Sequence, residues 1–273
     1  MSGTLITVAP TGAEHRKADV PNLPVTLSEL VRTAQDCERV GAGMIHVHIR
    51  DSHGEPTLEL ARLTETVAAL REHTNLVVQL STGGAVTDEE DERLRVLDAL
   101  PDSASCTMGT VNFGDEVFRN RWPFIVELHG RMQERGIVPE YEIFDLGHLA
   151  SLHRLLDTHG GPEHVHVDLV MGVPGGMPGD TETLVAALRA LPAGATFSAT
   201  GIGRSSLPVM LASLSAGGHL RVGMEDTVSY ARGEKVNDNA QLVARASGLA
   251  RIAQRPPLAP DAVRELLAVR RNG

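Results

Sequence analysis

The amino-acid sequence predicts a (β/α)8 TIM barrel that occupies residues 1–273 as a single domain and carries an added helix near its carboxyl end. Short apolar runs rich in β-branched residues alternate with amphipathic stretches along the whole chain, which is typical of parallel strands connected by helices. Eight such units fit the length that a closed barrel requires. The alternative is a doubly wound open sheet, but Pro10-Thr-Gly-Ala-Glu14 stands where that fold has a glycine-rich dinucleotide turn.

The individual elements follow from local patterns. Thr26 and Glu29 have the spacing of a capping box at the start of the first helix, and Gly41 and Gly136 stand where helix ends need a left-handed residue. After a break at Pro256-Pro257, residues 260–269 have the pattern of the added helix. The predicted strands are residues 5–10, 44–50, 76–81, 103–108, 138–144, 164–171, 196–200 and 219–224. The predicted helices between them are residues 26–40, 58–72, 88–100, 122–135, 147–158, 181–190, 207–216 and 239–253.

The composition excludes several classes of protein. A net charge of −10 argues against a nucleic-acid partner, because such proteins need a basic face. No apolar stretch approaches about 18 residues and no charged-then-apolar leader begins the chain, so we expect neither a membrane span nor a targeting signal. Cys37 and Cys106 stand in unrelated contexts, as in a reduced, cytoplasmic protein. Any anionic substrate must then be held by a local group of residues, since the overall charge repels it.

His46 and His48 are the first candidates for chemistry. They lie two residues apart in a predicted strand, so both imidazoles project from the same face. Two such imidazoles suit a divalent metal, usually zinc. The spacing alone is equally compatible with two buried histidines that hydrogen-bond to their neighbours.

His164 and His166 have the same spacing but a different position along their strand. They open their apolar run, whereas His46 and His48 stand in the second half of theirs, close to its carboxyl end. In parallel α/β folds the chemistry collects at the carboxyl ends of the strands. We therefore expect the first pair to serve function and the second to serve packing.

Polar residues or glycines follow every predicted strand, which indicates a binding site at the carboxyl face of the barrel. In the last strand Arg221 and Glu225 share parity, so both point into the barrel. This strand returns beside the first strand and near the second, so Glu225 can complete a metal site with His46 and His48. Asp226 is then free to act as a base beside a cation. A surface ion pair for Glu225 and a buried structural pair for Arg221 remain the alternatives.

Two glycine-rich segments and one acid complete the set of candidates. In the loops at residues 81–84 and 173–177, backbone N–H groups can approach an oxyanion closely, although a simple turn needs glycine too. Glu14 stands at the barrel mouth, where it could bind a cation on the substrate or be a solvated loop residue.

The ordered set of motifs resembles the β-keto acid cleavage enzymes, of which the 3-keto-5-aminohexanoate cleavage enzymes are typical, over nearly the whole chain. The motifs are Thr11-Gly-Ala-Glu14, Pro21-Asn-Leu-Pro24, His46-Val-His-Ile-Arg50, Gln79-Leu-Ser-Thr-Gly-Gly-Ala-Val86, Gly109-Thr-Val-Asn-Phe-Gly114, Gly172-Val-Pro-Gly-Gly-Met177, Gly201-Ile-Gly-Arg204, Gly217-Gly-His-Leu-Arg-Val-Gly-Met-Glu-Asp226 and Asn239-Ala-Gln-Leu-Val243. The resemblance implies a zinc-dependent barrel that converts a β-keto acid and acetyl-CoA into acetoacetate and a new acyl-CoA. It also implies a homotetramer.

The resemblance assigns a role to each candidate residue. His46, His48 and Glu225 match the Zn2+ ligands, Asp226 the catalytic base and Arg221 its partner. The substrate-binding candidates are Glu14 for a substrate amine, Ser81, Thr82, Gly83 and Gly84 for the carboxylate, and Ser105 and Glu142 at further contact positions. Residues 105–108 and 145–148 depart from the pattern of the family, so the side group of the keto acid is left open.

Two other classes of function would account for fewer of the candidate residues. A metal-dependent hydrolase of the amidohydrolase type also carries two histidines at this spacing on a barrel strand. Such an enzyme usually needs further histidines at strands five and six and often a lysine on strand four. Here strand five ends in Glu142 and Phe144, strand four has no lysine, and the two histidines lie on strand two instead of strand one. A metal-binding protein without catalytic activity would leave Arg221, Asp226 and the two glycine loops unexplained.

Overall fold

The computed structural model, which describes residues 3–270, contains a closed barrel of eight parallel strands. The strands follow one another around the ring in chain order, and the last pairs with the first to close it. The predicted (β/α)8 barrel is therefore confirmed. The barrel strands are β1 (Ile6–Val8), β2 (Met44–Val47), β5 (Val77–Leu80), β6 (Ser103–Thr107), β9 (Val138–Ile143), β10 (His166–Met171), β11 (Thr196–Gly201) and β12 (His219–Val222).

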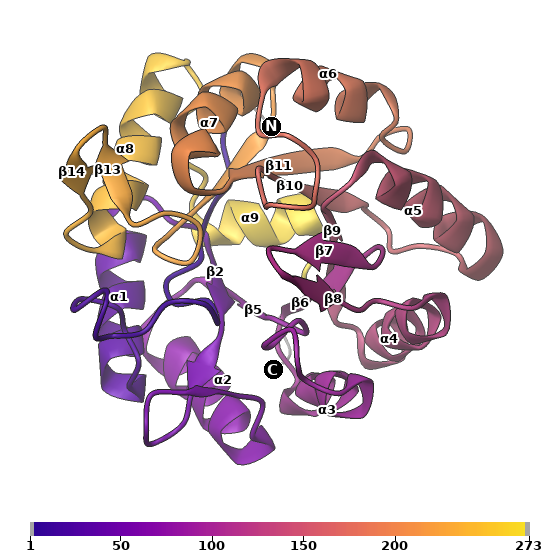
Figure 1. Cartoon of the computed structure of the whole chain (residues 1–273), viewed down its shortest axis with the longest axis horizontal. Coiled ribbons are helices and arrows are strands. Elements are labelled where there is room, and N and C mark those ends of the chain that lie inside the picture. Colours follow the sequence, from indigo (N-terminus) through magenta and orange to yellow (C-terminus); the bar gives the residue numbers. More distant parts are fainter. Residues whose placement is uncertain (1–2, 271–273) are drawn as a thin grey trace.

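Helices follow each barrel strand and surround the ring (Figure 1). The predicted capping box is present, since the Thr26 side chain accepts from the Glu29 amide and the Glu29 carboxylate accepts from the Thr26 amide. Gly41 and Gly136 end two helices in the left-handed conformation, with φ of 120° and 68°. The helices are α1 (Leu27–Val40), α2 (Leu60–His73), α3 (Glu90–Arg95) with the 3-10 turn η1 (Val96–Ala99), α4 (Trp122–Arg135), α5 (Leu146–His159), α6 (Thr181–Arg189), η2 (Gly203–Ser205), α7 (Ser206–Ser215), α8 (Asn239–Ile252) and α9 (Pro260–Leu267).

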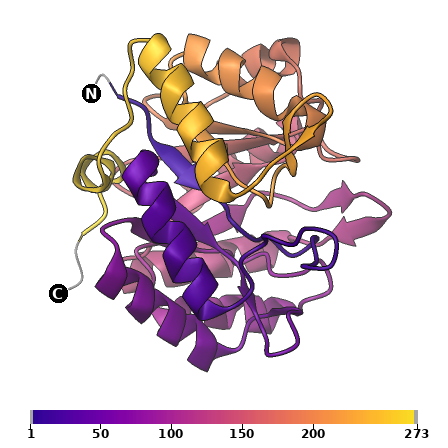
Figure 2. The same ribbon diagram turned by 90° about the vertical axis from the view of Figure 1, so that its left-hand side faces the viewer.

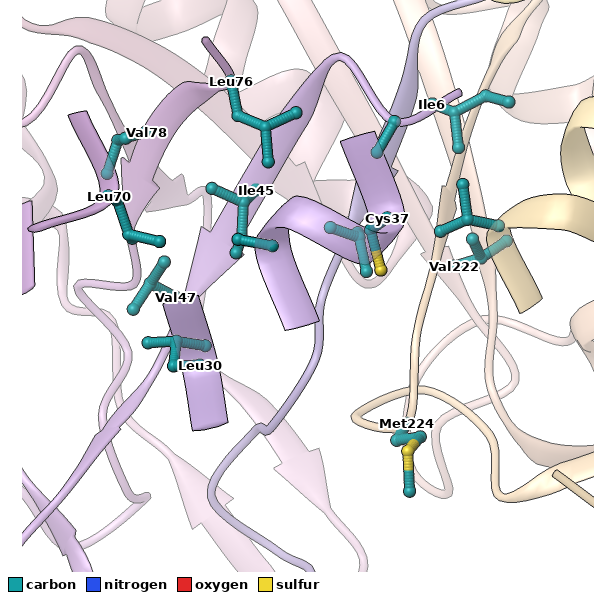
Figure 3. Packing of buried hydrophobic residues seen from close by; sticks show 14 of the residues in the cluster. Ile6, Leu30, Cys37, Ile45, Val47, Leu70, Leu76, Val78, Val222 and Met224 are labelled. Atoms are coloured by element: carbon teal, nitrogen blue, oxygen red, sulfur yellow. The ribbon is translucent and has the colours of Figure 1, made fainter. Parts of the chain in front are cut away.

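The outward faces of the strands are apolar and pack beneath the helices. Figure 3 shows part of this layer, in which Ile45 of β2 and Val222 of β12 belong to one buried cluster with Leu30 and Cys37 of α1 and Leu70 of α2. Burying an aliphatic side chain of this size contributes about 1.5–3 kcal/mol. The layer between strands and helices is therefore the main hydrophobic core.

The inward faces are polar, although aliphatic residues usually fill the interior of a (β/α)8 barrel. Hydrogen bonds that join strands which are not neighbours, from Gln79 to Glu140 and from Arg221 to Glu142, place these side chains inside the ring. A polar interior is stable only where its groups satisfy one another. The buried polar residues of the barrel strands are Thr7, His46, Gln79, Ser103, Ser105, Thr107, Glu140, Glu142, His166, Asp168, Ser198, Thr200, His219 and Arg221.

The two ends of the barrel differ. Helix α9 covers the amino ends of the strands, where Val263 and Leu267 pack against Leu5, Met44 and Val77. Three hairpins lie in the loops after carboxyl ends: β3 (Ile49–Arg50) with β4 (Pro56–Thr57), β7 (Val111–Phe113) with β8 (Glu116–Phe118), and β13 (Ser229–Ala231) with β14 (Glu234–Lys235). Figure 2 shows α9 in yellow and the β7–β8 hairpin in magenta on opposite sides of the barrel.

The structure differs from the predicted elements in four respects. The three hairpins were not predicted, the segment at residues 88–100 divides into α3 and η1, and β10 begins at His166 instead of residue 164. In addition, β1, β2 and β12 end two or three residues earlier than predicted. Strands of two or three residues carry too little pattern to be found in a sequence. Among residues 3–270, no helix has both the length and the apolar character needed to cross a membrane.

Candidate active site

A cavity of about 610 Å3 lies at the carboxyl ends of the barrel strands. Residues at the ends of all eight strands, or in the loops that follow them, contribute to its wall. His46, Glu142 and Arg221 line it from their strands, Asp226 lines it from the loop after β12, and Glu14 lines it from the loop after β1. The binding site expected at this face of the barrel is therefore present as a cavity.

Three ligand atoms converge on one side of this cavity. Oε1 of Glu225 lies 3.8 Å from Nε2 of His46 and 3.6 Å from Nε2 of His48. The other carboxylate oxygen of Glu225 is buried and has no hydrogen-bond partner among the described residues. All three ligand atoms lie within 4.8 Å of one another, a group that could hold a metal ion. The three residues that the sequence predicted as metal ligands therefore lie together.

The order of strands around the ring explains why these residues meet. Strand β1 pairs with β2 on one side and with β12 on the other, so the loop after β12 crosses the end of β1 to reach β2. The amide of Glu225 donates to the carbonyl of Ala9 at 3.2 Å. Gly12 makes room for the crossing: its φ is +62°, and a Cβ there would lie 2.6 Å from Cγ of Glu225.

Gln79 fixes the orientation of the His46 ring. Its Nε2 donates to Ser103 and Glu140, so its Oε1 faces Nδ1 of His46 at 2.5 Å and accepts that proton. Nε2 of His46 then presents its lone pair to the ligand cluster. Burial, with the help of Arg221, lowers the pKa of His46 to about 3, and burial also lowers the pKa of His48. Both rings are therefore neutral, the form that binds metals.

Arg221 connects the acidic side chains beside the ligand cluster. Its guanidinium donates to Asp226 at 2.9 Å, to Glu142 at 3.3 Å and also to Glu225. Asp168 lies 4.0 Å away. Burial opposes the charge of Arg221, but these carboxylates outweigh it and hold the pKa of the guanidinium well above its usual value. Arg221 thus stays charged and holds the acids in place.

The acids of the cavity have pKa values that differ widely. Burial raises the pKa of Asp226 to about 7 and that of Glu142 to about 7, although Arg221 opposes both shifts. Burial raises the pKa of Glu225 too, but there Arg221 and the two imidazoles dominate and lower it to about 2. Burial therefore outweighs the guanidinium at Asp226, whereas the guanidinium and the imidazoles outweigh burial at Glu225. Environments that separate the pKa values of neighbouring acids are typical of acid–base sites.

The glycine loop after β5 presents one side-chain donor to the cavity. Ser81, Gly83 and Gly84 line the cavity and Thr82 does not. The Thr82 amide donates to Ser105, and the Gly83 amide donates to Oγ of Ser81 at 3.1 Å. These two amides are therefore engaged within the protein instead of facing a substrate oxyanion. Because Oγ of Ser81 already accepts a proton, its own O–H is left to donate into the cavity.

Ser105 and Thr82 lie behind the cavity wall. Ser105 is fully buried, and its hydroxyl and carbonyl oxygens accept from the amide and the hydroxyl of Thr82. These two residues support the loop, whereas the other predicted site residues all line the cavity. Glu14 is exposed at its edge.

An aromatic wall, which sequence reasoning missed, forms another part of the cavity. The β7–β8 hairpin supplies Phe113 and Phe118, and Phe144 follows β9. Their ring centroids lie 6.2–6.4 Å apart in edge-to-face contacts, and Val170 and Val173 extend the apolar surface. The chain has five phenylalanines, so two of them within the segment 113–118 were a signal that could have been used.

Hydrogen bonds hold the second histidine pair, which the sequence assigned to packing. His166 bonds to the hydroxyls of Thr196 at 2.7 Å and Ser198 at 3.0 Å, and His164 bonds to Thr196 at 2.7 Å. Burial lowers the pKa of His166 well below its usual value. This pair therefore has a structural role.

Comparisons with known proteins identify the family. A family model described as beta-keto acid cleavage enzyme matches residues 4–269. The chain is 35% identical to a 3-keto-5-aminohexanoate cleavage enzyme of Acetoanaerobium sticklandii, over 98% of this chain and 99% of that protein. It is 34% identical to a 3-oxoadipate:acetyl-CoA acetyltransferase of Cupriavidus necator, over 97% of this chain and 94% of that protein.

A solved structure described as the apo structure of ObcA has a similar fold, with a TM-score of 0.78 and 18% identity, over 91% of this chain and 66% of that one. The likeness to ObcA concerns the fold alone. The family match is of a different kind, because it spans every strand of the barrel and every residue of the cavity wall. The chain belongs to the beta-keto acid cleavage enzyme family and is an enzyme of that kind.

Proposed function

We propose that this enzyme combines a β-keto acid with acetyl-CoA and releases acetoacetate and a new acyl-CoA, with zinc held by His46, His48 and Glu225. The observation that carries the proposal is the convergence of these three ligand atoms, beside Asp226, in the cavity at the strand ends. Membership of the family supports the class of reaction, and the Cupriavidus relative is named as an acetyl-CoA acetyltransferase.

The donor set fits zinc. Two neutral imidazoles and one carboxylate are a common set in catalytic zinc sites, which keep a further position for substrate or water. The buried oxygen of Glu225 without a partner is the kind of polar atom that a cation would satisfy. When bound, zinc would supply a Lewis acid for the keto and carboxylate oxygens of the substrate.

The surrounding side chains suit the remaining steps. Asp226, held by two hydrogen bonds from Arg221, would take a proton from C2 of the β-keto acid as general base. The Ser81 hydroxyl would receive the substrate carboxylate, with Gly84 and Glu142 as further contacts on the cavity wall.

The overall reaction exchanges two acyl groups. The C2 carbanion attacks the thioester carbonyl of acetyl-CoA and displaces the CoA thiolate. That thiolate then attacks the original keto carbon, the bond between this carbon and C2 breaks, and acetoacetate leaves. The acyl fragment remains on CoA, and the proton taken by Asp226 returns to C2.

Within this class we propose a substrate that carries an amine or another cation, with 3-keto-5-aminohexanoate as the lead candidate and 3-aminobutyryl-CoA as its product. Glu14 supports this choice, because a carboxylate at the cavity edge favours a cation and repels a second carboxylate. The aromatic wall offers a surface for the hydrocarbon part of such a substrate. Overall sequence similarity does not distinguish an amino substrate from a diacid. The relative named for an amino substrate is 35% identical to this chain, and the relative named for a diacid is 34% identical.

The test is a panel of amino, neutral and acidic β-keto acids, assayed with and without acetyl-CoA by mass spectrometry. Acetoacetate and the matching acyl-CoA should form together, and only with acetyl-CoA present. Turnover that does not need acetyl-CoA would instead support a metal-dependent hydrolase.

Asp226→Asn tests the base directly, because it keeps the size of the side chain and removes its basicity. Loss of a positioned general base should lower turnover by about 10²–10⁴-fold while the bound zinc is retained. If this variant exchanged the C2 protons of the substrate with deuterated water at the wild-type rate, another residue would be the base.

We also propose a homotetramer, as the family resemblance implies. Val185 of α6 and Leu207 and Leu211 of the neighbouring α7 are large apolar side chains with 39–47% of their surface exposed, and contact with another subunit would cover them. Light scattering in solution measures the mass, and a monomer would contradict this proposal.

A further inference from the structure

Arg93 of α3 is a buried arginine whose hydrogen bonds, among the residues that the structure describes, go only to uncharged oxygens. Its side chain is 2% exposed, and each of its three guanidinium nitrogens donates to a carbonyl or amide oxygen at 2.6–2.7 Å. The guanidinium also lies over the rings of Phe118 and Phe124, 4.8 and 4.3 Å from their centroids. Burying a charge without an ionic partner is unfavourable, so the contacts that this residue makes require an explanation.

These contacts join two parts of the cavity wall. Nε donates to the carbonyl of Thr82 in the glycine loop, while the other two nitrogens donate to the carbonyl of Arg119 and the side-chain oxygen of Asn120, directly after β8. The Asn120 amide group in turn donates to the carbonyl of Gly109. Arg93 thus connects the loop that contains Ser81 with the hairpin that carries the aromatic wall.

The contact with Thr82 has a direct consequence for Ser81. The Thr82 carbonyl and the Gly83 N–H belong to one planar peptide unit, so fixing one end of this unit fixes the other. The carbonyl end accepts from Arg93, and the N–H end donates to Oγ of Ser81. A cation on the carbonyl also polarises the peptide and strengthens the bond that its N–H makes.

We propose that Arg93 is a positioning residue that orients the Ser81 hydroxyl toward the substrate carboxylate by holding the Thr82–Gly83 peptide. This inference rests on the proposed function, in which Ser81 receives that carboxylate. The planar fork of arginine reaches three acceptors at once, whereas the single ammonium of lysine cannot span all three in one geometry.

The experiment is a double-mutant cycle of Arg93→Lys and Ser81→Ala in the zinc-loaded enzyme, with acetoacetate as the probe. Arg93→Lys should weaken acetoacetate binding about tenfold or more, because small misplacements of a positioning group are costly. The KM for acetyl-CoA should stay within about twofold of wild type. In the Ser81→Ala background, Arg93→Lys should cause no further loss of acetoacetate binding, since the group through which it acts is already removed.

Hydrogen exchange at the Gly83 amide measures the proposed contact without any substrate. Exchange at this amide should be at least about tenfold faster in Arg93→Lys. Without the hydrogen bond from Arg93 to the Thr82 carbonyl, the bond from the Gly83 amide to Ser81 opens more often. Arg255→Lys is the matched control, because Arg255 also donates to backbone carbonyls, of Gly3 and Gly218, at the other end of the barrel. Arg93→Gln replaces the lysine variant if the latter does not fold.

Three results separate the possibilities. Equal losses of acetoacetate binding in both backgrounds, or an unchanged Gly83 exchange rate, would overturn the role of Arg93. A wild-type enzyme that neither binds acetoacetate nor forms acyl-CoA would contradict the proposed function, and the Gly83 exchange rate would still decide whether Arg93 holds this peptide. Faster Gly83 exchange together with non-additive losses supports the proposal.

Discussion

Replacing Gln79 by leucine should weaken zinc binding while leaving all three ligands in place. Gln79 is fully buried, and its oxygen lies 2.5 Å from Nδ1 of His46. Without this acceptor, the His46 ring can rotate or carry its proton on Nε2, the atom that faces Glu225. The ligand set would then be chemically complete but poorly oriented.

The expected magnitude follows from the contacts of this side chain. Removing a group that hydrogen-bonds to a metal ligand typically lowers metal affinity by about 10–100-fold, which corresponds to about 1.4–2.7 kcal/mol. Leucine also leaves Ser103 and Glu140 without their bonds to Nε2 of Gln79, so the free energy of unfolding should fall by about 1–3 kcal/mol as well. The two effects are separable, since zinc affinity is measured on the folded variant.

The assay is a zinc titration of the metal-free protein in competition with a chromophoric chelator. Gln79→Glu is the matched control, because it keeps an acceptor for Nδ1 of His46 and should bind zinc at least as tightly as wild type. The reasoning fails if folded Gln79→Leu binds zinc with wild-type affinity. It also fails if both variants lose affinity equally, because an acceptor for Nδ1 of His46 would then make no difference to zinc binding.

Three further predictions follow. His46→Ala should remove zinc and abolish turnover while His166→Ala keeps zinc near stoichiometric, and metal analysis with the opposite pattern would invert the assignment of the two pairs. Glu14→Gln should lower kcat/KM for an amino β-keto acid by roughly 10–100-fold relative to a neutral one, from the loss of one charge-assisted hydrogen bond; an equal loss for amino, neutral and acidic substrates would refute the amine hypothesis. Burial, with Asp168 adding to it, raises the pKa of Glu140 from 4.5 to about 8, so the stabilisation by this protonated acid is complete below pH 4.5 and is lost as the pH rises through 8. The melting temperature of Glu140→Gln relative to wild type should therefore increase between about pH 5 and about pH 9, and a constant difference would show that Glu140 is ionised in the folded protein.

The barrel could be predicted from the sequence because its main signals are local. Amphipathic helices and apolar runs repeat in order, and the capping box at Thr26 and the glycine at 136 mark helix ends that the structure confirms. The β7–β8 hairpin could not be predicted, since it depends on contacts with distant loops, such as the bond from the Gly114 amide to the carbonyl of Pro174. Such contacts leave no periodic pattern in the sequence.

The site could be predicted in part. His46 follows from strand parity, and closure of the ring brings the end of β12 near β2. His48 comes just after β2 and Glu225 lies in the turn after β12, so strand parity does not place these two residues. The location of Ser105 behind the wall does not follow, because a strand-end serine can face the cavity or the adjoining loop with the same parity. The role of Arg93 could not be predicted from the sequence, since its hydrogen-bond partners come from two segments, at Thr82 and at Arg119–Asn120, that only the folded chain brings to it.

The sequence also contains the pattern of the polar interior, but this pattern was not used in predicting the barrel. Glu140 and Glu142, like His166 and Asp168, alternate with apolar residues, which indicates strands with one polar face. In most parallel barrels both faces of each strand are apolar, so the strands were predicted from apolar runs alone, without use of this alternation.

Because of this alternation, the side chains of a single strand divide into those that stabilise the fold and those that form the site. Ile45 and Val47 point outward into the core beneath the helices, while His46 between them points inward to Gln79 and the ligand cluster. Truncating an outward residue such as Ile45 creates a cavity in the core, which costs about 2–5 kcal/mol, but removes no contact of the site. Truncating an inward residue removes a hydrogen-bond partner and leaves a buried polar group unsatisfied. The apolar layer therefore keeps the strands rigid. The polar side chains that point inward from these strands can then hold each candidate metal ligand in one orientation.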